Sequence, residues 1–99
     1  METQTIPQMS ILQTGKEYKI LRVSGEKGSQ MPAHFCTKEA IIIVQEGIAL
    51  LKLTAQDIHL KKNDSAIIPA GELHTLIVQE NFQATVIMGI DSDIKFANK

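Results

Sequence analysis

The sequence predicts an all-β fold, a small antiparallel barrel, from its choice of apolar residues and the spacing of its turns. Isoleucine occurs fourteen times against eight leucines, and β-branched side chains favour the pleated surface of a strand. Segments of strand length alternate with Gly, Pro, Asn and Asp turn signals, and no stretch repeats its apolar residues with a helical period. Short strands at such spacing are typical of antiparallel sandwiches and barrels.

Four strands are expected in the first half of the chain, each ended by a turn signal. The first, Tyr18–Ser24, leads into a glycine-rich turn, and the second, Ala33–Thr37, follows that turn. Strands at Ala40–Gln45 and Ile48–Thr54 are separated by Glu46-Gly47, a pair that favours a hairpin turn. The closely spaced turns predict neighbouring antiparallel strands.

Four further strands are expected in the second half. Asn-Asp, Pro-Ala-Gly and Glu-Asn sequences separate them, and each of these sequences is a turn signal. We expect these strands at Asp57–Lys61, Ser65–Pro69, Leu73–Gln79 and Gln83–Ile90.

Length and composition predict one domain over residues 1–99. Residues 1–12 are expected to be loosely held and residues 91–99 to form a fraying tail. A net charge of -1, three Phe, one Tyr and no Trp argue against a nucleic-acid surface, which needs clustered cations or aromatic platforms. The longest purely apolar run is Ala40–Val44, far short of the ~20 residues that cross a bilayer. With a single cysteine, the composition fits a cytoplasmic protein without a membrane partner.

Two segments carry candidate ligands for a metal ion or a small molecule. His34 and Cys36 are two residues apart in a predicted strand, so their side chains project from the same face. His74 follows the Pro69-Ala-Gly71 turn by three residues, which places a third candidate at the start of a strand. The three side chains are therefore expected to share one space.

These residues resemble the two motifs of the cupin superfamily of small jelly-roll barrels. In the first motif Gly28, His34 and Gly47 match at the family spacing, while Cys36 replaces a His and Ala40 replaces a Glu. In the second motif Pro69, Gly71 and His74 match in register. Asn63 and Val78 replace the family's Gly and Asn there. The resemblance covers Gly28 to Val78 and implies a small cupin with a degenerate metal-binding motif.

The resemblance implies a metal site at His34, Cys36 and His74, without the usual carboxylate because Ala40 stands in its place. Two imidazoles and a thiolate are ligands that suit zinc above all, with iron or copper as alternatives. The same residues could instead hold no metal, as polar side chains in the barrel mouth with a buried cysteine. A thiolate–imidazole pair of Cys36 and His34 is a third interpretation.

The run Ala40–Val44 predicts both the lining of the pocket and a partner. Ala40, Ile42 and Val44 share a face and should line the barrel, and Arg22 is a candidate for binding an anionic ligand there. Ile41 and Ile43 then face outwards, and an unbroken apolar run implies that both faces are covered. Amino-terminal strands or a second copy of the chain could cover them, and we expect a homodimer.

Three functions remain open at this point. The first is a small-molecule-binding cupin of unassigned reaction, with or without a metal in the barrel. The second is a metal-dependent enzyme of the dioxygenase, isomerase or decarboxylase type that cupins include. The third is a metal-free binding, regulatory or interaction module. Because one fold supports many activities, the resemblance does not select among them.

Overall fold

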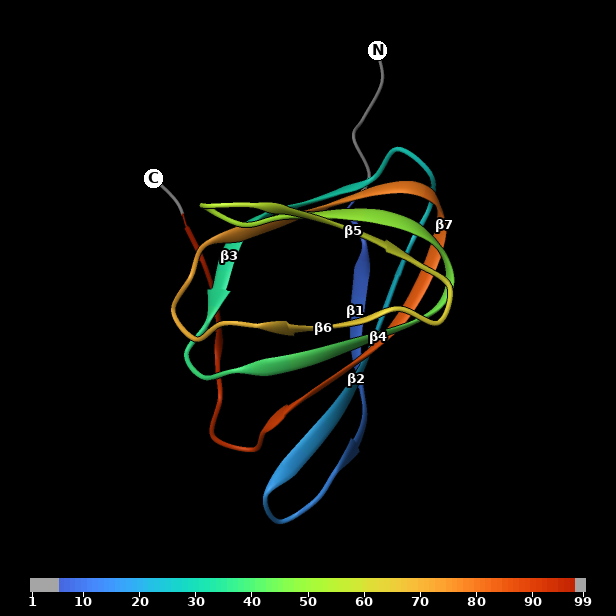
Figure 1. Ribbon diagram of the computed structural model, residues 1–99. Coiled ribbons are helices and arrows are strands. Elements are labelled where there is room, and N and C mark those ends of the chain that lie inside the picture. Colours follow the sequence, from blue (N-terminus) through green and yellow to red (C-terminus); the bar gives the residue numbers. More distant parts are fainter. Residues whose placement is uncertain (1–5, 98–99) are drawn as a thin grey trace.

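The computed structural model describes residues 6–97, which form one antiparallel sheet of eight strands curled into a barrel (Figure 1). This confirms the predicted all-β barrel. The strands are β1 (Gln8–Thr14), β2 (Tyr18–Gly25), β3 (Gln30–Cys36), β4 (Ala40–Lys52), β5 (Asp57–Lys61), β6 (Ser65–Ile68), β7 (His74–Gly89) and β8 (Ile94–Phe96).

The long strand β7 connects the two sides of the barrel. Along one path the strand order is β1-β2-β7-β3-β8, and β4 pairs with β5, β6 and β7. All of these pairings are antiparallel. Because β7 pairs with β2, β3 and β4, it holds the predicted ligand strand β3 in the same sheet as the central strand β4.

Two pairs of predicted strands are continuous in the structure. Ala40–Gln45 and most of Ile48–Thr54 lie in β4, which ends at Lys52. Leu73–Gln79 and Gln83–Ile90 lie in β7 except for Leu73 and Ile90. The predicted turn at Glu46-Gly47 is instead a bend within β4, where its register with β7 shifts between Val44 and Ala49. A bulge and a turn both use a glycine with positive φ, so the sequence signal does not separate them.

Gly47 allows β4 to bend closely over β7. Its φ is 87°, and a Cβ atom placed on it would lie 2.0 Å from the Asn81 carbonyl oxygen. No side chain can occupy that space, because the obstacle is backbone. Gly47 is therefore required where β4 crosses β7.

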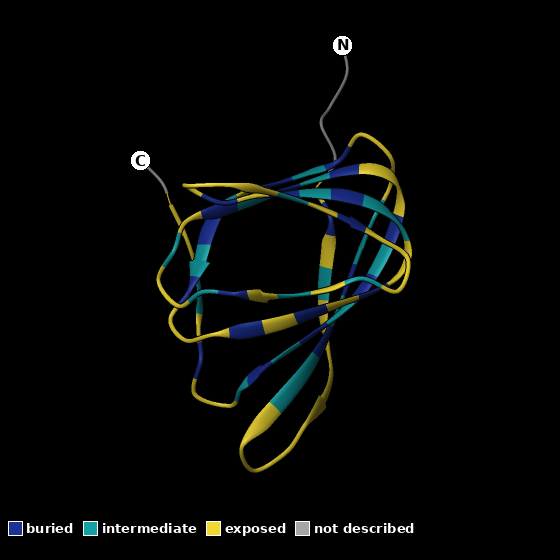
Figure 2. Cartoon of the chain, in the orientation of Figure 1, coloured by how far each residue is buried: buried dark blue, intermediate teal, exposed yellow. Residues whose placement is uncertain are grey.

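Alternating residues of β4 face into the barrel, as the sequence predicts. Ala40, Ile42 and Val44 are no more than 2% exposed, whereas Ile41 and Ile43 face outwards and are 38% and 36% exposed. Figure 2 shows this alternation as successive buried and exposed bands along the first half of β4. Full burial of an isoleucine or valine side chain stabilises the fold by roughly 1.5–3 kcal/mol.

Strands form within both terminal segments of the described chain. Residues 8–12 of the segment expected to be loose belong to β1, which pairs with β2, and residues 94–96 of the expected tail form β8, which pairs with β3. β1 joins β2 through a short turn at Gly15, whereas β3, the partner of β8, is distant in sequence and leaves no local signal. Residues 1–5 and 98–99 lie outside the described part of the chain.

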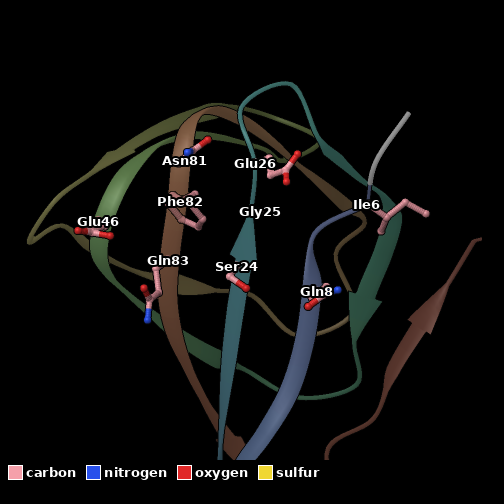
Figure 3. A pocket seen from close by; sticks show the side chains of 9 residues that line it. All are labelled: Ile6, Gln8, Ser24, Gly25, Glu26, Glu46, Asn81, Phe82 and Gln83. Atoms are coloured by element: carbon pink, nitrogen blue, oxygen red, sulfur yellow. The ribbon is translucent and has the colours of Figure 1, made fainter. Parts of the chain in front are cut away.

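The outer face of the sheet carries a polar row at one end. Its members are register partners on β1, β2, β7 and β4, namely Gln8, Ser24, Gln83 and Glu46. They line an open groove of about 470 Å³ together with neighbouring residues such as Glu26 and Asn81 (Figure 3). This groove lies outside the barrel and contains none of the predicted ligands.

Over residues 6–97 the structure contains no helix that is long and apolar enough to cross a membrane.

Replacing Gly47 with alanine is expected to destabilise the protein by about 2–4 kcal/mol, because the new methyl group would meet the Asn81 backbone. Gly71 supplies a matched control, since its φ is also positive, at 75°, but a Cβ atom added there would have no neighbour within 4 Å. Gly71→Ala should cost only about 1 kcal/mol. Urea denaturation measures both, and equal losses would show that the close approach at Gly47 is unimportant.

Candidate functional site

The two predicted histidines lie opposite one another on neighbouring strands. His34 is on β3 and His74 is the first residue of β7, and their Cα atoms are direct partners in the β3–β7 ladder. The Pro69-Ala-Gly71 turn leads into β7 and places it in this register. The Gly71 amide donates a hydrogen bond of 2.8 Å to the Cys36 carbonyl oxygen, which fixes the turn to the end of β3.

The imidazole rings are in contact inside the barrel mouth. Their centroids are 4.2 Å apart and their planes meet at 65°. Phe96 of β8 lies on the other side of His34, with ring centroids 5.1 Å apart. His34 and His74 are 6% and 4% exposed, so both rings are removed from bulk water.

Backbone carbonyl groups orient both rings. His34 Nδ1 lies 2.7 Å from the Pro32 carbonyl oxygen, and His74 Nδ1 lies 3.0 Å from the Glu72 carbonyl oxygen. A carbonyl oxygen can only accept, so each Nδ1 carries the proton and donates it. In the neutral ring the other nitrogen, Nε2, then has a free lone pair.

The local sequence of β3 explains the first of these bonds. The register with β7 shifts between Met31 and His34, which leaves Pro32 in an irregular part of the strand. Proline has no N–H to contribute to a ladder and is found at such positions. Its carbonyl oxygen accepts from the His34 ring.

Burial favours the neutral form of both imidazoles. Desolvation lowers the pKa of His34 below 6.5, and the neighbouring His74 lowers it further, while the hydrogen bond to Pro32 acts in the opposite direction. Desolvation also lowers the pKa of His74, against the raising effects of the Glu72 carbonyl and carboxylate. At neutral pH the site therefore presents two neutral rings.

Cys36 lies in the same cavity as a buried free cysteine. Desolvation raises its thiol pKa, and the positive charge of Lys19 lowers it by a smaller amount. The thiol is therefore the favoured form at neutral pH. This argues against the thiolate–imidazole pair, because a reactive cysteine needs a depressed pKa.

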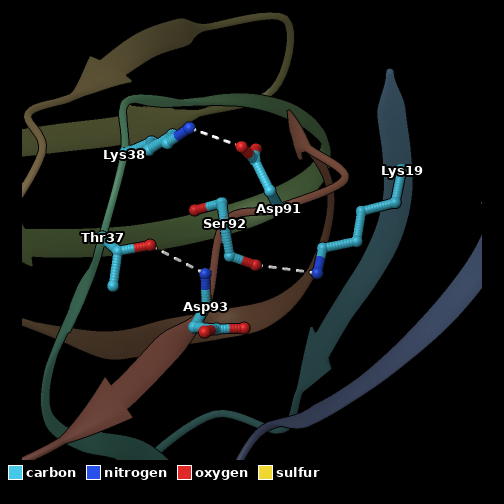
Figure 4. A network of polar contacts seen from close by, with 6 residues as sticks. All are labelled: Lys19, Thr37, Lys38, Asp91, Ser92 and Asp93. Atoms are coloured by element: carbon cyan, nitrogen blue, oxygen red, sulfur yellow. Dashed lines mark hydrogen bonds and ion pairs between the residues drawn. The ribbon is translucent and has the colours of Figure 1, made fainter. Parts of the chain in front are cut away.

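Polar contacts hold the segment before β8 next to this site (Figure 4). Lys19 Nζ donates to the Ser92 carbonyl oxygen, and the Asp93 amide donates to Thr37 Oγ1. Lys38 and Asp91 form an exposed ion pair. These contacts position β8, whose Ile94 lines the cavity and whose Phe96 covers His34.

The cavity is narrow and apolar apart from the three predicted side chains. Its volume is about 40 Å³. The other residues that line it are Met9, Val23, Met31, Ile42, Leu51, Ile68, Leu76, Val86, Met88 and Ile94. A water molecule needs roughly 10–15 Å³ of such space, so the cavity suits an ion with a water or two.

His34, Cys36 and His74 all line one cavity, but the close contact is between the two histidine rings. Within residues 6–97, no set of three or more His, Cys, Asp or Glu side chains lies close enough together to hold a metal ion. The two imidazoles are suited to metal binding by their tautomers, since each Nε2 is free. Cys36 remains a protonated neighbour.

The predicted pocket lining is only partly found. Ile42 lines the cavity, whereas Ala40 and Val44 are buried on the same side of β4 away from it. Arg22 does not line the cavity, because Leu21 and Val23 are the buried residues of β2 and Arg22 faces out. Phe96 is a neighbour of the site that the sequence did not predict, and an aromatic residue in the expected tail was the one available signal.

The curled sheet and the histidine pair at its mouth define a small cupin. The chain matches the family described as mannose-6-phosphate isomerase C-terminal over residues 6–92, and it belongs to that family. No curated protein matches it.

Solved structures with low sequence identity share the fold. An uncharacterised conserved protein with a double-stranded β-helix domain from Klebsiella pneumoniae superposes with a TM-score of 0.82 at 19% identity, covering 100% of this chain and 90% of that one. A cupin superfamily protein from Desulfitobacterium hafniense gives 0.78 at 19% identity, covering 92% and 84%. The DMSP lyase DddQ from Ruegeria pomeroyi gives 0.84 at 17% identity, covering 93% of this chain and 52% of the lyase.

The free energy of unfolding is expected to fall as the pH decreases below about 6.5, where unfolded histidine takes up a proton. The native pKa values of His34 and His74 are lower, so in this range the unfolded chain binds more protons and is favoured. The slope should reach up to about 1.4 kcal/mol per pH unit for each histidine. Urea denaturation between pH 7 and pH 5 measures it.

Replacing both histidines with glutamine should flatten this dependence. His59→Gln is the matched control, because His59 is an exposed residue of β5 outside the cavity. An unchanged slope in the His34→Gln/His74→Gln variant would show that these rings are not the buried neutral groups of the fold.

Proposed function

We propose that this protein is a small-ligand-binding cupin in which His34 and His74 bind a transition-metal ion. One observation carries the proposal. Both Nδ1 atoms are bound to backbone carbonyl oxygens, which leaves both Nε2 lone pairs available, and both histidines line the same cavity. Orientation of a ligating imidazole by a hydrogen bond from its other nitrogen is the common arrangement around protein-bound metals.

The size and lining of the cavity support an ion rather than an organic molecule. A pocket for a small organic ligand usually measures roughly 300–1,000 Å³, whereas this cavity measures about 40 Å³. Imidazole nitrogens suit zinc, copper and iron, and zinc is the ion we expect first. Water would complete the coordination, and the bound ion would act as a Lewis acid.

The family is named after a sugar-phosphate isomerase, but the lining of this cavity does not suit a sugar phosphate. A phosphate group is usually held by Arg or Lys side chains or by several backbone amides, and no Arg or Lys lines the cavity. A hexose phosphate would also exceed its volume. Binding is therefore a better description of the site than isomerase activity.

The residues that line the cavity also give little support for acid–base catalysis. Besides the two histidines and Cys36, every residue that lines the cavity is apolar. Each imidazole has its Nδ1 bound to a carbonyl and its Nε2 assigned to the ion, so neither is free as a general base. This favours the binding protein over the metal-dependent enzyme.

The proposal is tested by titrating the metal-free protein with Zn²⁺ and Co²⁺, followed by calorimetry and by the visible spectrum of cobalt. The parent protein should bind one ion. His34→Ala and His74→Ala should each weaken binding by more than about 100-fold, beyond the usual cost of losing an outer hydrogen-bond partner. His59→Ala should bind as the parent does.

Two results would count against metal binding at the histidine pair. A parent protein that binds neither ion, or binding that survives both histidine variants, would leave the metal-free module as the better description. Thermal denaturation of each variant shows whether it is folded.

The role of Cys36 is tested by the pH dependence of zinc affinity. If only the imidazoles bind zinc, affinity should be constant above about pH 6.5, where they are already neutral. If Cys36 binds as a thiolate, its raised pKa makes each bound ion displace a proton, and affinity should rise about tenfold per pH unit through neutrality. We expect the first result, with Cys36→Ser retaining zinc affinity.

A further inference from the structure

The methionines of residues 6–97 all line the cavity that holds the histidine pair. Met9 comes from β1, Met31 from β3 and Met88 from β7. Met31 and Met88 are 3% and 2% exposed, and Met9 is half-buried against the core. Methionine often fills irregular gaps anywhere in a core. Here the three thioethers gather at one small cavity instead, beside two imidazoles and a thiol.

An irregularity in β3 places Met31 on the same side of the strand as His34. In a regular strand residues three apart face opposite sides. The register of β3 with β7 shifts between Met31 and His34, and both side chains are buried. Bulges commonly re-aim a side chain next to a functional site. Because Cys36 follows on the inner side, β3 alone presents one imidazole and two sulfur-bearing side chains to the cavity.

Met31 lies in the inward-facing row next to the histidine pair. Its register partner is Leu76, which is two residues after His74 on the same face of β7. Two residues along a strand span roughly 7 Å between Cα atoms, and the flexible methionine side chain can bridge such a gap. Met31 is therefore the methionine best placed to share a ligand with the two rings.

The donor atoms of the cavity are nitrogen and sulfur only. None of the described residues that line it carries a side-chain oxygen. Thioether sulfur suits soft ions such as Cu(I), whereas carboxylate and carbonyl oxygens suit hard ones. Imidazole binds both copper and zinc, and zinc also accepts thiolate sulfur. The charge of the site distinguishes the two ions.

The lining supplies no carboxylate to balance a divalent ion. Neither Asp nor Glu is among the described residues that line the cavity. The Born cost of moving an ion from water into an apolar medium grows with the square of its charge, so it is about four times greater for a divalent ion than for a monovalent ion of similar size. Imidazole and thioether ligands are neutral and cannot offset the second charge. The cavity therefore suits Cu(I) better than Zn²⁺.

We propose that methionine thioethers make this cavity selective for Cu(I), which is bound by His34 and His74 together with Met31, while Met9 and Met88 complete its sulfur-rich surroundings. The inference rests on the proposed function, because it assigns the ion to the same histidine pair. Zinc, the first choice for two imidazoles alone, becomes the weaker-binding ion once the sulfur atoms are counted.

The test is anaerobic titration of the metal-free protein with Cu(I), in competition with a chromogenic Cu(I) chelator and with ascorbate present to keep copper monovalent. The parent should bind one Cu(I) more than about 100-fold more tightly than Zn²⁺. Met31→Leu should weaken Cu(I) binding by at least about tenfold, and the triple variant Met9→Leu/Met31→Leu/Met88→Leu by at least about 100-fold. Leucine replaces methionine with little change in volume, so the loss reports the sulfur.

Two controls separate sulfur binding from a change in packing. The triple variant should bind Co²⁺ as the parent does, because its histidines are unchanged. Leu60→Met makes the reverse exchange at a buried residue of β5 outside the cavity and should leave both affinities unchanged. X-ray absorption of the Cu(I)-loaded parent should show copper–sulfur scattering, which Cys36→Ser keeps and the triple variant loses.

Three results would overturn the inference while leaving the histidine pair as a metal site. They are a Cu(I) affinity no greater than the Zn²⁺ affinity, a triple variant that binds Cu(I) as the parent does, and loss of copper–sulfur scattering in Cys36→Ser, which would assign the sulfur ligand to the thiol. Failure of the proposed function looks different. The parent would then bind neither Zn²⁺ nor Co²⁺, Cu(I) binding would survive the loss of both histidines, and this inference would fail with it.

Discussion

The antiparallel pairing of β3 with β7 is the constraint on which the site depends. It places His34 directly opposite His74, although forty residues separate them in the chain. The Gly71 amide ties the preceding turn to Cys36, so the register cannot slip without breaking that bond. The sequence predicts only that these two histidines share one space, and the strand pairing brings their rings into contact.

Two further effects convert this pair of rings into a binding element. Burial makes the charged imidazolium costly, so both rings are neutral at physiological pH. The Pro32 and Glu72 carbonyl groups then decide which nitrogen keeps the proton. Neither effect is sufficient alone, because a neutral ring of the other tautomer would offer a donor to the cavity, and a charged ring would offer no lone pair.

The sequence predicts the parts of this structure that follow local rules. Alternation along β4 correctly places Ala40, Ile42 and Val44 inside, and the motif spacing places both histidines in one cavity. It fails where the answer depends on distant pairing. Phe96, for example, reaches His34 only because β8 adds to the edge of β3. The bend at Gly47 shows the same limit, since a hairpin and a bulge use the same residue.

The tautomers of the two imidazoles test this account most directly, and ring nitrogen chemical shifts from two-dimensional ¹H–¹⁵N spectra of the metal-free protein at pH 7 report them. For His34 and His74 we predict a protonated Nδ1 and a bare Nε2 in both rings. A protonated Nε2 in either ring, or an imidazolium, would contradict the account, because the cavity would then lack the paired lone pairs on which the proposed function depends.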